Sequence, residues 1–211
     1  MFFLIIGLGN PGEAYRKHRH NVGFWAVERL AQTNRLRWTV GEGPMLQAQG
    51  GIDGQQVLLV KPQTFMNLSG QAVVHAQAKL GLKEYRIIVL HDDLDLALGR
   101  LQVRFGGGDG GHRGVRSVAS ELAAEDFGRI RMGVGRSTTD AETVDHVLSP
   151  FADEEWVLAE AMATRAAEAV QVWMREGLKT AMNRFNPWKK PKPNEVETST
   201  NAGNEPGDAA D

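Results

Sequence analysis

The segment Phe2-Phe-Leu-Ile-Ile-Gly-Leu-Gly-Asn-Pro-Gly12 sets an apolar run directly before a glycine-rich turn. A short apolar run closed by glycine is typical of a buried strand. Strand-like and helix-like segments alternate along the residues that follow, and this order is typical of an α/β fold. We therefore expect an α/β, single-domain three-layer sandwich with a twisted mixed β-sheet flanked by helices.

The remaining elements follow from hydrophobic periodicity and turn residues. Further strands are expected at 45–49, 57–61, 86–91, 101–105 and 130–134. Helices are expected at 21–35, 67–80, 112–122 and 152–176. The segment Gly50-Gly-Ile-Asp-Gly54 predicts a hairpin turn, and Gly81 is expected to end a helix.

Composition excludes several classes of protein. The chain has 211 residues and no cysteine, so disulfides and a thiolate nucleophile are excluded. Any zinc site would have to use histidine and carboxylate ligands alone. The start lacks a basic leader, and no apolar run approaches the ~18 residues that a membrane span needs. We expect a cytoplasmic protein that does not enter a membrane.

Residues 186–211 differ from the rest of the chain. Apart from Trp188 and Val196 they offer almost nothing to bury, which predicts a disordered polar C-terminal tail. Residues 1–185 are then expected to form the folded domain. The three lysines and five acids of the tail account for the whole formal net charge of −2. The sequence shows no heptad seam, which favours a monomer.

The glycines at 7, 9 and 12 match the G-x-G-x-x-G pattern of dinucleotide-binding turns. The context disfavours that interpretation, because the next residues, 13–20, have no apolar face that could pack as a helix. No acidic residue closes a second strand about 20 residues further on. We interpret the segment as a tight turn that places Asn10 and Tyr15 at the carboxyl end of a strand, where open α/β sheets bind ligands.

Two histidines lie among cations in Lys17-His-Arg-His-Asn21. Such residues are unusual in a core, so they indicate either a functional position or a solvated cationic loop. Metal binding by His18 and His20 has little support, because no third ligand is evident nearby.

A carboxylate cluster, His91-Asp-Asp-Leu-Asp95, ends a strongly apolar strand. Close carboxylates repel one another unless a cation or a donor lies among them. We expect Asp95 to cap a turn and another carboxylate to face a histidine, fixing its tautomer and stabilising its protonated form. A metal-binding acidic cluster is the alternative.

The segment Gly106-Gly-Gly-Asp-Gly-Gly-His-Arg-Gly114 lets backbone amides approach a ligand closely. It lacks the Gly-Lys-Ser/Thr ending of a P-loop, so nucleoside triphosphate binding is not indicated. A mobile linker is the alternative, but His112 is expected to open a helix. That arrangement would bring a titratable group and free amide donors together.

Arginines recur at even spacing in two expected strands. Arg100 and Arg104 share one strand face, and Arg129 and Arg131 share another. On adjacent strands they would form a cationic patch that fits a phosphate, since guanidinium groups bind phosphate through two parallel hydrogen bonds. Solvated arginines at a sheet edge are the alternative.

Six segments of the chain together resemble one known family. They are Gly-Leu-Gly-Asn-Pro-Gly-Glu-Ala-Tyr-Arg-Lys-His-Arg-His-Asn-Val-Gly (7–23), Lys-Pro-Gln-Thr-Phe-Met-Asn-Leu-Ser-Gly (61–70), Val-Leu-His-Asp-Asp-Leu-Asp-Leu (89–96), Gly-Gly-Gly-Asp-Gly-Gly-His-Arg-Gly (106–114), Phe-Gly-Arg-Ile-Arg-Met-Gly-Val-Gly (127–135) and Asp-His-Val-Leu-Ser-Pro-Phe (145–151). In this order they resemble the bacterial-type peptidyl-tRNA hydrolase family, over nearly all of residues 1–185.

The resemblance implies hydrolysis of the ester that joins a peptide, or an N-blocked amino acid, to the 3′ end of tRNA. This reaction recycles peptidyl-tRNA that ribosomes release prematurely. No metal and no organic cofactor are implied, and the expected partner is peptidyl-tRNA, bound through its acceptor stem and 3′ end. A family member that only binds or processes RNA, without hydrolysis, is the alternative.

The resemblance also implies roles for single residues. His20 would be the general base that takes a proton from water, with Asp92 holding it, and Asn10 would read the N-acylated end. A phosphate clamp would be formed by Arg104 and Arg131. The residues expected around the 3′ adenosine, the ester and the peptide are Tyr15, Phe65, Asn67 and His112, with Met66 shaping the cleft.

One position departs from the family pattern. Arg113 follows His112 where the family usually has Asn. A cation without an acceptor thus replaces an amide, and we expect Arg113 to contact RNA phosphate or a carboxylate of the tail. Asp109 adds a negative charge to the glycine-rich segment, and the sequence suggests no role for it.

Overall fold

A computed structural model describes residues 1–81, 84–136 and 143–188, and its strands form one mixed sheet. The strand order is β2-β3-β4-β1-β5-β7-β6. Strands β4, β1, β5 and β7 run parallel, whereas β2, β3 and β6 join through antiparallel pairs. The strands are β1 Phe2–Gly7, β2 Thr39–Val40, β3 Met45–Ile52, β4 Gln55–Pro62, β5 Arg86–Asp93, β6 Leu101–Phe105 and β7 Gly128–Gly133.

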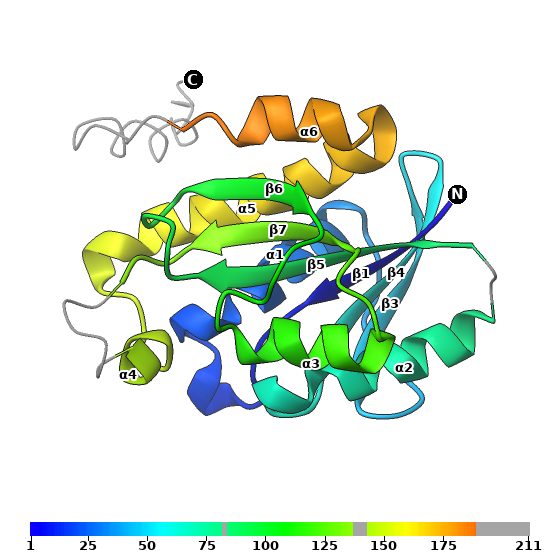
Figure 1. The fold of residues 1–211 in the computed structure, drawn as a ribbon, viewed down its shortest axis with the longest axis horizontal. Coiled ribbons are helices and arrows are strands. Elements are labelled where there is room, and N and C mark those ends of the chain that lie inside the picture. Colours follow the sequence, from blue (N-terminus) through cyan, green and yellow to red (C-terminus); the bar gives the residue numbers. More distant parts are fainter. Residues whose placement is uncertain (82–83, 137–142, 189–211) are drawn as a thin grey trace, which may run out of the picture.

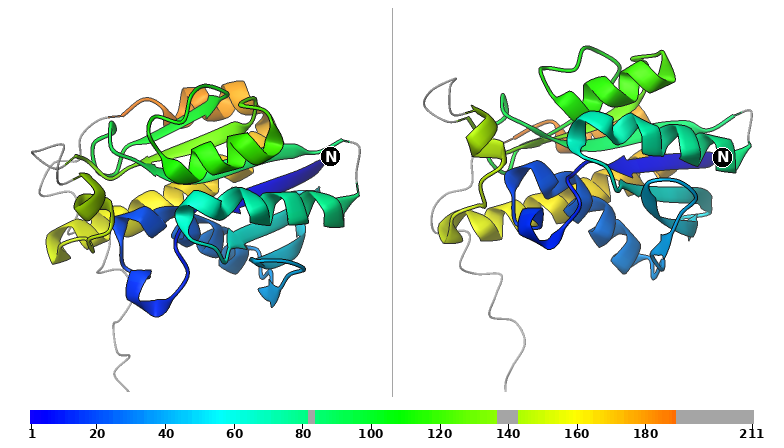
Figure 2. Two further views of the ribbon diagram at one scale, coloured as in Figure 1. Left: turned by 60° about the horizontal axis from the view of Figure 1, so that its bottom comes forward. Right: turned by 90° about the horizontal axis from the view of Figure 1, so that it is seen from below.

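Helices cover both faces of this sheet, which confirms the expected three-layer α/β sandwich (Figures 1 and 2). One face carries α1 Val22–Thr33, α5 Asp153–Glu176 and α6 Leu178–Phe185, and the other carries α2 Ser69–Leu80 and α3 Arg113–Leu122. A short helix, α4 Thr143–Val147, and the 3₁₀ turns η1 Glu13–Tyr15, η2 Arg19–Asn21 and η3 Met66–Leu68 complete the described elements.

Strand β1 supplies both cores, because alternate side chains of a strand point to opposite faces. Phe3 and Ile5 pack with α1, α5 and α6. Leu4 and Ile6 pack with α2 and α3. The apolar run at the start of the chain is therefore the central buried strand that its composition predicted.

Most of the expected elements are present within a few residues of their predicted ends. The hairpin is formed by β3 and β4, and Gly81 ends α2 in the left-handed conformation, with φ of 56°. Besides the 3₁₀ turns, the two-residue strand β2 and the helices α4 and α6 were not predicted. The predicted tail, 186–211, lies outside the described residues from 189 onward. None of the described helices is long and apolar enough to cross a membrane.

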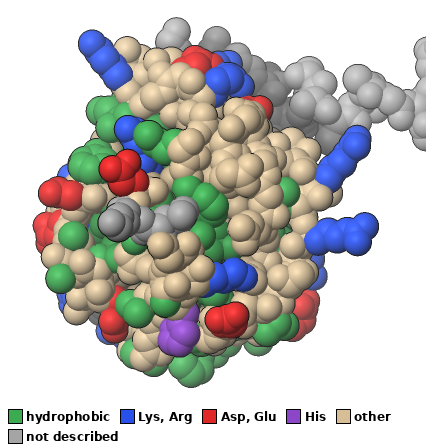
Figure 3. Space-filling view, turned by 90° about the vertical axis from the view of Figure 1, so that its right-hand side faces the viewer, with side chains coloured by type: hydrophobic (Ala, Val, Ile, Leu, Met, Phe, Trp, Pro, Cys, Tyr) green, Lys and Arg blue, Asp and Glu red, His purple; other side chains and the backbone are tan. Residues whose placement is uncertain are grey.

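The two ends of the parallel strands differ in character. Figure 3 faces their amino-terminal ends, where charged side chains of both signs are scattered among hydrophobic ones. The part of this face that the structure describes therefore shows no patch of a single charge. The polar motifs of the sequence lie at the opposite, carboxyl-terminal ends.

Helix α1 approaches the sheet closely at Gly23. A Cβ atom at this position would lie 2.4 Å from the carbonyl oxygen of Leu90 and 2.5 Å from that of Leu8. Because both neighbours are backbone atoms, no side-chain rotation can make room. The glycine thus sets the distance between α1 and the ends of β1 and β5.

The variant Gly23→Ala is expected to lower the free energy of unfolding by about 1–3 kcal/mol, the usual cost of overpacking a core. Urea denaturation monitored by circular dichroism measures this change. Gly51→Ala is the matched control, because its Cβ would meet no atom closer than 3.8 Å. Equal stability of the two variants would contradict the proposed role of Gly23.

Candidate active site

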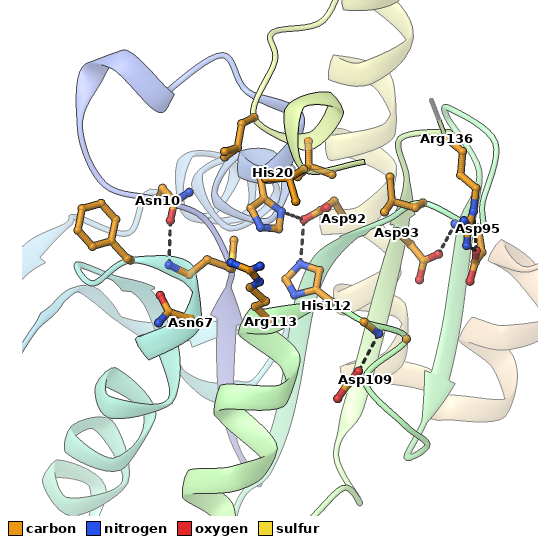
Figure 4. Close-up of a pocket in the computed structure, with 18 residues that line it drawn as sticks. Asn10, His20, Asn67, Asp92, Asp93, Asp95, Asp109, His112, Arg113 and Arg136 are labelled. Carbon is orange, nitrogen blue, oxygen red and sulfur yellow. Dashed lines mark hydrogen bonds and ion pairs between the residues drawn. The ribbon is translucent and has the colours of Figure 1, made fainter. Parts of the chain in front are cut away.

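A cavity of about 440 Å³ opens at the carboxyl ends of β1 and β5 (Figure 4). Segments far apart in the sequence meet there: the turn after β1, η2, η3, the end of β5, the glycine-rich loop and α4. The lining residues are Asn10, His20, Phe65, Met66, Asn67, Asp92, Asp93, Leu94, Asp95, Asp109, Gly110, Gly111, His112, Arg113, Arg136, Val144, Val147 and Leu148.

The carboxylate of Asp92 joins two imidazoles at the centre of this cavity. It is 2% exposed, and its Oδ1 atom lies 2.8 Å from His20 Nδ1 and 2.9 Å from His112 Nε2. An ionised carboxylate only accepts hydrogen bonds, so both imidazole nitrogens carry the proton. This arrangement leaves His20 Nε2 as the nitrogen of that ring that can act on a ligand.

His112 uses its other nitrogen to cap helix α3. Its Nδ1 accepts hydrogen bonds from the amides of Gly114, at 3.1 Å, and Val115, at 3.2 Å. The predicted helix start is confirmed, but these two amides are used in the cap instead of being free for a ligand. His112 is consequently held with its Nε2 N–H pointing at Asp92.

The electrostatics of the cluster favour an ionised Asp92. Burial alone would raise the pKa of its carboxyl, but His20 and His112 outweigh burial and hold that pKa well below 3.8. Burial also opposes protonation of His20, yet the attraction and hydrogen bond of Asp92 raise the pKa of His20 above 6.5. Arg113 acts in the opposite direction and lowers the pKa of His20.

His91 lies behind this cluster as a neutral, buried ring. Burial, then the proximity of His112, lowers its pKa to about 3. Its Nδ1 donates to the carbonyl of Asp92 at 2.7 Å, and its ring packs edge-on to that of His112 with centroids 4.9 Å apart. His91 therefore supports the cluster from the core side.

The segment around His20 is anchored to the residues before and within α5. Arg19 donates to Glu155 at 2.7 Å and stacks over the ring of Phe151, while its amide donates to the carbonyl of Ser149. Arg19 itself is only 7% exposed. The segments 17–21 and 145–151 thus contact each other, and these contacts fix the backbone position of His20.

Asn10 is held in one orientation by its neighbours. Its Oδ1 accepts the amide of Met66 at 2.8 Å, and its backbone exchanges two hydrogen bonds, both 2.9 Å, with the side chain of Asn21. Since Oδ1 is occupied, the side chain offers the cavity only the N–H groups of Nδ2. Asn21 stands directly before α1, but its side chain makes no capping hydrogen bond there and binds Asn10 instead.

The opposite wall comes from η3 and the start of α3. Phe65 stands at the rim with 62% of its surface exposed, and Met66 is buried against the base of the wall. A Cβ at Gly114 would lie 2.4 Å from Met66 Sδ, so the glycine lets α3 contact η3 closely. This packing brings Asn67 and Arg113 into the same wall.

The remaining carboxylates of the cavity are paired with arginines. Asp93 pairs with Arg131 and also accepts the amide of Asp95 at 2.9 Å. The turn cap is therefore Asp93, and the prediction of Asp95 was wrong, because Asp95 points outward to Arg136. The tail carboxylates considered as partners of Arg113 lie outside the described residues.

Asp109, for which the sequence suggested no role, closes the glycine-rich loop. It accepts the amide of Gly111 at 2.7 Å and pairs with Arg116 of α3 at 2.8 Å. Gly110 and Gly111 have φ of 59° and 82°, a conformation that glycine adopts without strain. The loop is thus folded back on the helix that it precedes.

Tyr15 does not line this cavity. It lies in η1 with its ring edge-on to His18, the centroids being 5.4 Å apart. The turn at Gly12, with φ of 108°, directs η1 away from the cavity lined by His20. Phe65, Asn67 and His112, in contrast, lie where they were expected.

The predicted cationic patch forms on β6 and β7, on the side of the sheet that bears α3. The apolar residues of these strands face α5 and α6, and no helix covers their other side in Figure 1. Arg104 lies opposite Arg129 in the strand register, and Gln102 opposite Arg131. The arginines therefore share the face of these strands that no helix covers, and the glycine-rich loop contacts Arg129 there.

The arginines of this patch differ in their partners. Arg131 binds Asp93 and Gln102, and Arg129 donates to the carbonyl of Gly108 at 2.6 Å. Arg129 is 2% exposed, and its Nε and Nη2 atoms have no protein partner among the described residues. Within that same part of the chain, Arg104 has no hydrogen bond or ion pair.

Two features of the site were not assigned from the sequence. Leu94, Val147 and Leu148 form an apolar wall, which only the recognised motif at 145–151 could have suggested. His20, Asp92 and His112 also bring possible metal-ligand atoms within 4.8 Å of one another. The hydrogen bonds between the same atoms account for that proximity.

Comparisons with known proteins agree on one family. A family model described as peptidyl-tRNA hydrolase matches residues 4–195. The chain is 44% identical over 186 residues to a peptidyl-tRNA hydrolase of Chloroflexus aurantiacus, covering 88% of this chain and 99% of that protein. One from Dehalococcoides mccartyi is 44% identical over 186 residues, with coverage of 87% and 98%. The crystal structure of peptidyl-tRNA hydrolase from Acinetobacter baumannii has a TM-score of 0.82 at 33% identity, covering 89% of this chain and 96% of that one.

The variant Asp92→Asn is expected to lower the pKa of His20. Asparagine removes the negative charge that stabilises the imidazolium, while burial and Arg113 continue to oppose protonation. An NMR titration of the His20 ring measures the change. Asp95→Asn is the control, because it also removes a carboxylate from the cavity but one that does not contact His20. An equal change in the pKa of His20 in both variants would refute the role of Asp92 as its partner.

Proposed function

The chain belongs to the peptidyl-tRNA hydrolase family, and from this premise we propose that His20 is the general base of its reaction. The activity is hydrolysis of the ester between a peptidyl group and the 3′ end of tRNA, which recycles peptidyl-tRNA. The observation that carries the proposal is the bond from His20 Nδ1 to the buried Asp92, which leaves Nε2 toward the cavity. We place this reaction in the cytoplasm, where ribosomes release the substrate.

The reaction proceeds by proton transfer through His20. Its neutral Nε2 takes a proton from water as the water oxygen bonds to the ester carbonyl carbon, and the carbonyl electron pair moves to oxygen. Collapse of that intermediate breaks the bond to the ribose 3′ oxygen, which receives the proton from His20. Asp92 stabilises the imidazolium between these steps, and His112 holds Asp92 in place.

Asn10 selects N-acylated substrates. Its Nδ2 can donate to the carbonyl oxygen of an N-acyl group, because its own Oδ1 is occupied by Met66. The α-ammonium of a free aminoacyl ester has donors only, so it finds no acceptor on this side chain. An unpaired polar group in a buried site weakens binding, which disfavours aminoacyl-tRNA.

Phe65 and Asn67 contact the 3′ end of the tRNA. The exposed ring of Phe65 at the rim offers a surface on which the terminal adenine can stack. The amide of Asn67, which lines the cavity, can donate to an oxygen that becomes negative in the transition state. The reaction so described uses no metal and no organic cofactor.

Arg104 and Arg131 bind backbone phosphate of the tRNA acceptor stem. They lie on the face of β6 and β7 that no helix covers, and Arg104 has no competing partner within the described part of the chain. Phosphate contacts orient the RNA and carry little sequence information. Arg129, tied to the glycine-rich loop, lies between them and supports the same positive field.

The variant His20→Asn is expected to lower kcat by about 10²–10⁴-fold, the usual contribution of a general base. Asparagine keeps a donor for Asp92 but offers no base. Release of N-acetyl-amino acid from N-acetyl-aminoacyl-tRNA measures the rate, beside unblocked aminoacyl-tRNA and with a metal chelator present. His18→Asn is the matched control, since His18 belongs to the same segment but does not line the cavity.

Wild type that binds tRNA without cleaving the blocked substrate would favour the RNA-binding alternative. Full activity of His20→Asn would instead agree with hydrolysis but refute the role of His20 as the general base.

The double variant Arg104→Ala/Arg131→Ala is expected to weaken tRNA binding and flatten its salt dependence. Each lost phosphate contact reduces the slope of log K against log salt by roughly 0.7–0.9. Fluorescence anisotropy across a series of salt concentrations measures the slope. Arg165→Ala, on α5 across the sheet, controls for the loss of positive charge. An unchanged slope in the double variant would refute the binding of phosphate by Arg104 and Arg131.

A further inference from the structure

Arg113 is the first residue of α3 and faces the reacting end of the cavity. It lines the cavity together with His20 and Asn67. Figure 4 shows its guanidinium extending from the start of α3 into the space between these two side chains. The residue therefore lies beside both the proposed base and the proposed amide donor.

The charge of Arg113 is uncompensated, unlike that of its neighbours in the cavity. Asp92 is bonded to two histidines, Asp93 to Arg131, and Asp109 to Arg116. Asp95 and Arg136 pair with each other. Within residues 1–81, 84–136 and 143–188, no hydrogen bond or ion pair engages Arg113. The cavity thus presents one cation that is free to meet negative charge on a ligand.

This cation does not serve the stability of the helix that bears it. The amino-terminal end of a helix carries partial positive charge, so a cation in the first turn is unfavourable there. The packing nevertheless fixes it in this position, because Gly114 lets the start of α3 contact Met66 closely. The charge of Arg113 destabilises the start of α3 and yet is kept facing the cavity, which indicates that it binds a ligand.

A second cavity, of about 470 Å³, lies on the outer side of the same wall. Asn67 and Arg113 line both this cavity and the one that holds His20. The ester substrate has two arms, and its carbonyl lies at their junction. A substrate that occupied both cavities would place its central atoms over Asn67 and Arg113.

We propose that Arg113 is a catalytic residue, whose guanidinium donates hydrogen bonds to the ester carbonyl oxygen as negative charge develops on it. The proposal rests on the proposed function, since the oxyanion arises when water adds to the carbonyl carbon and its proton passes to His20. Asn67 donates to the same oxygen from η3. Both donors withdraw when the carbonyl re-forms and the 3′ oxygen leaves with the proton.

Arg113 has a second effect, exerted through space on the base. Its positive charge opposes protonation of His20 and so lowers the pKa of His20. Removing this charge is expected to move the acidic limb of the pH profile to higher pH, since His20 must be neutral to act.

The test compares Arg113→Met and Arg113→Lys with the wild-type enzyme. Arg113→Met, which keeps the length of the side chain but no donor, is expected to lower kcat by roughly 10²-fold with little change in KM, as for the loss of one oxyanion donor. Arg113→Lys should recover part of that loss. The acidic limb of kcat/KM against pH should move upward in Arg113→Met.

A comparison of two substrates distinguishes whether Arg113 binds the oxyanion or a phosphate. They are N-acetyl-aminoacyl-tRNA and the 3′-O-(N-acetyl-aminoacyl) ester of adenosine, which has no phosphate. The proposal expects Arg113→Met to lower kcat/KM by a similar factor on both. A defect confined to the tRNA substrate, expressed in KM and in salt dependence, would overturn it in favour of a phosphate contact. If the wild type does not cleave the small ester, the division between kcat and KM on tRNA decides.

Arg165→Met is the matched control, because Arg165 lies on α5 across the sheet and lines neither of the two cavities. Its activity should stay within about twofold of wild type, since it makes no contact with the reacting atoms. An equal loss in both variants would overturn the proposal by showing a general effect of charge. Absence of hydrolysis in the wild type would refute the proposed function itself, whereas an active wild type with an equally active Arg113→Met would refute only the role of Arg113.

Discussion

A carboxylate without access to water must be compensated inside the protein, and Asp92 imposes this requirement on the carboxyl end of the sheet. Leaving a buried charge without its partner costs about 3–5 kcal/mol. His20 and His112 supply the compensation from opposite sides, from η2 and from the start of α3. The position of His20 is fixed by the ion pair between the neighbouring Arg19 and Glu155. The position of His112 is fixed by its hydrogen bonds to the first amides of α3. Much of the surrounding loop structure is thus arranged around a single oxygen atom.

The same requirement explains how the cavity distributes its charges. Asp93, Asp95 and Asp109 each have an arginine partner, so that several carboxylates can lie near one another without mutual repulsion. Beside the acceptor nitrogen Nε2 of His20, the groups that the described residues leave toward a ligand include three donors, Asn10 through Nδ2, Asn67 and Arg113. A site of this kind favours a ligand rich in acceptor oxygens. Peptidyl esters, with an N-acyl carbonyl, an ester carbonyl and nearby phosphates, fit that description.

The sequence predicted most of the long elements and missed β2, α4 and α6. Strand β1 was evident as an uninterrupted apolar run closed by glycine, and α5 was evident because its apolar residues recur at helix spacing over many positions. The two-residue strand β2 and the short helix α4 have too few residues to produce a pattern, and pairing or packing with neighbours stabilises them. Among the site residues, His20, Asp92, Asn10, Phe65 and Asn67 were placed at strand ends and motifs that do converge. Tyr15 was expected beside Asn10, but it lies in η1 after the turn at Gly12 and does not line the cavity.

By itself the sequence determined the alternation of strands and helices, the buried central strand and the set of polar residues that end up at one edge, since each follows from local periodicity and turn chemistry. Only the tertiary structure decided which polar group binds which. Asp93 rather than Asp95 caps the turn, the side chain of Asn21 binds Asn10, and Arg113 has no hydrogen bond or ion pair within the described part of the chain. Other contacts of the site join segments that lie tens of residues apart, such as 10 and 66 or 92 and 112. Hydrogen-bond partners are selected by distance and direction in space, and sheet order and close helix packing set both.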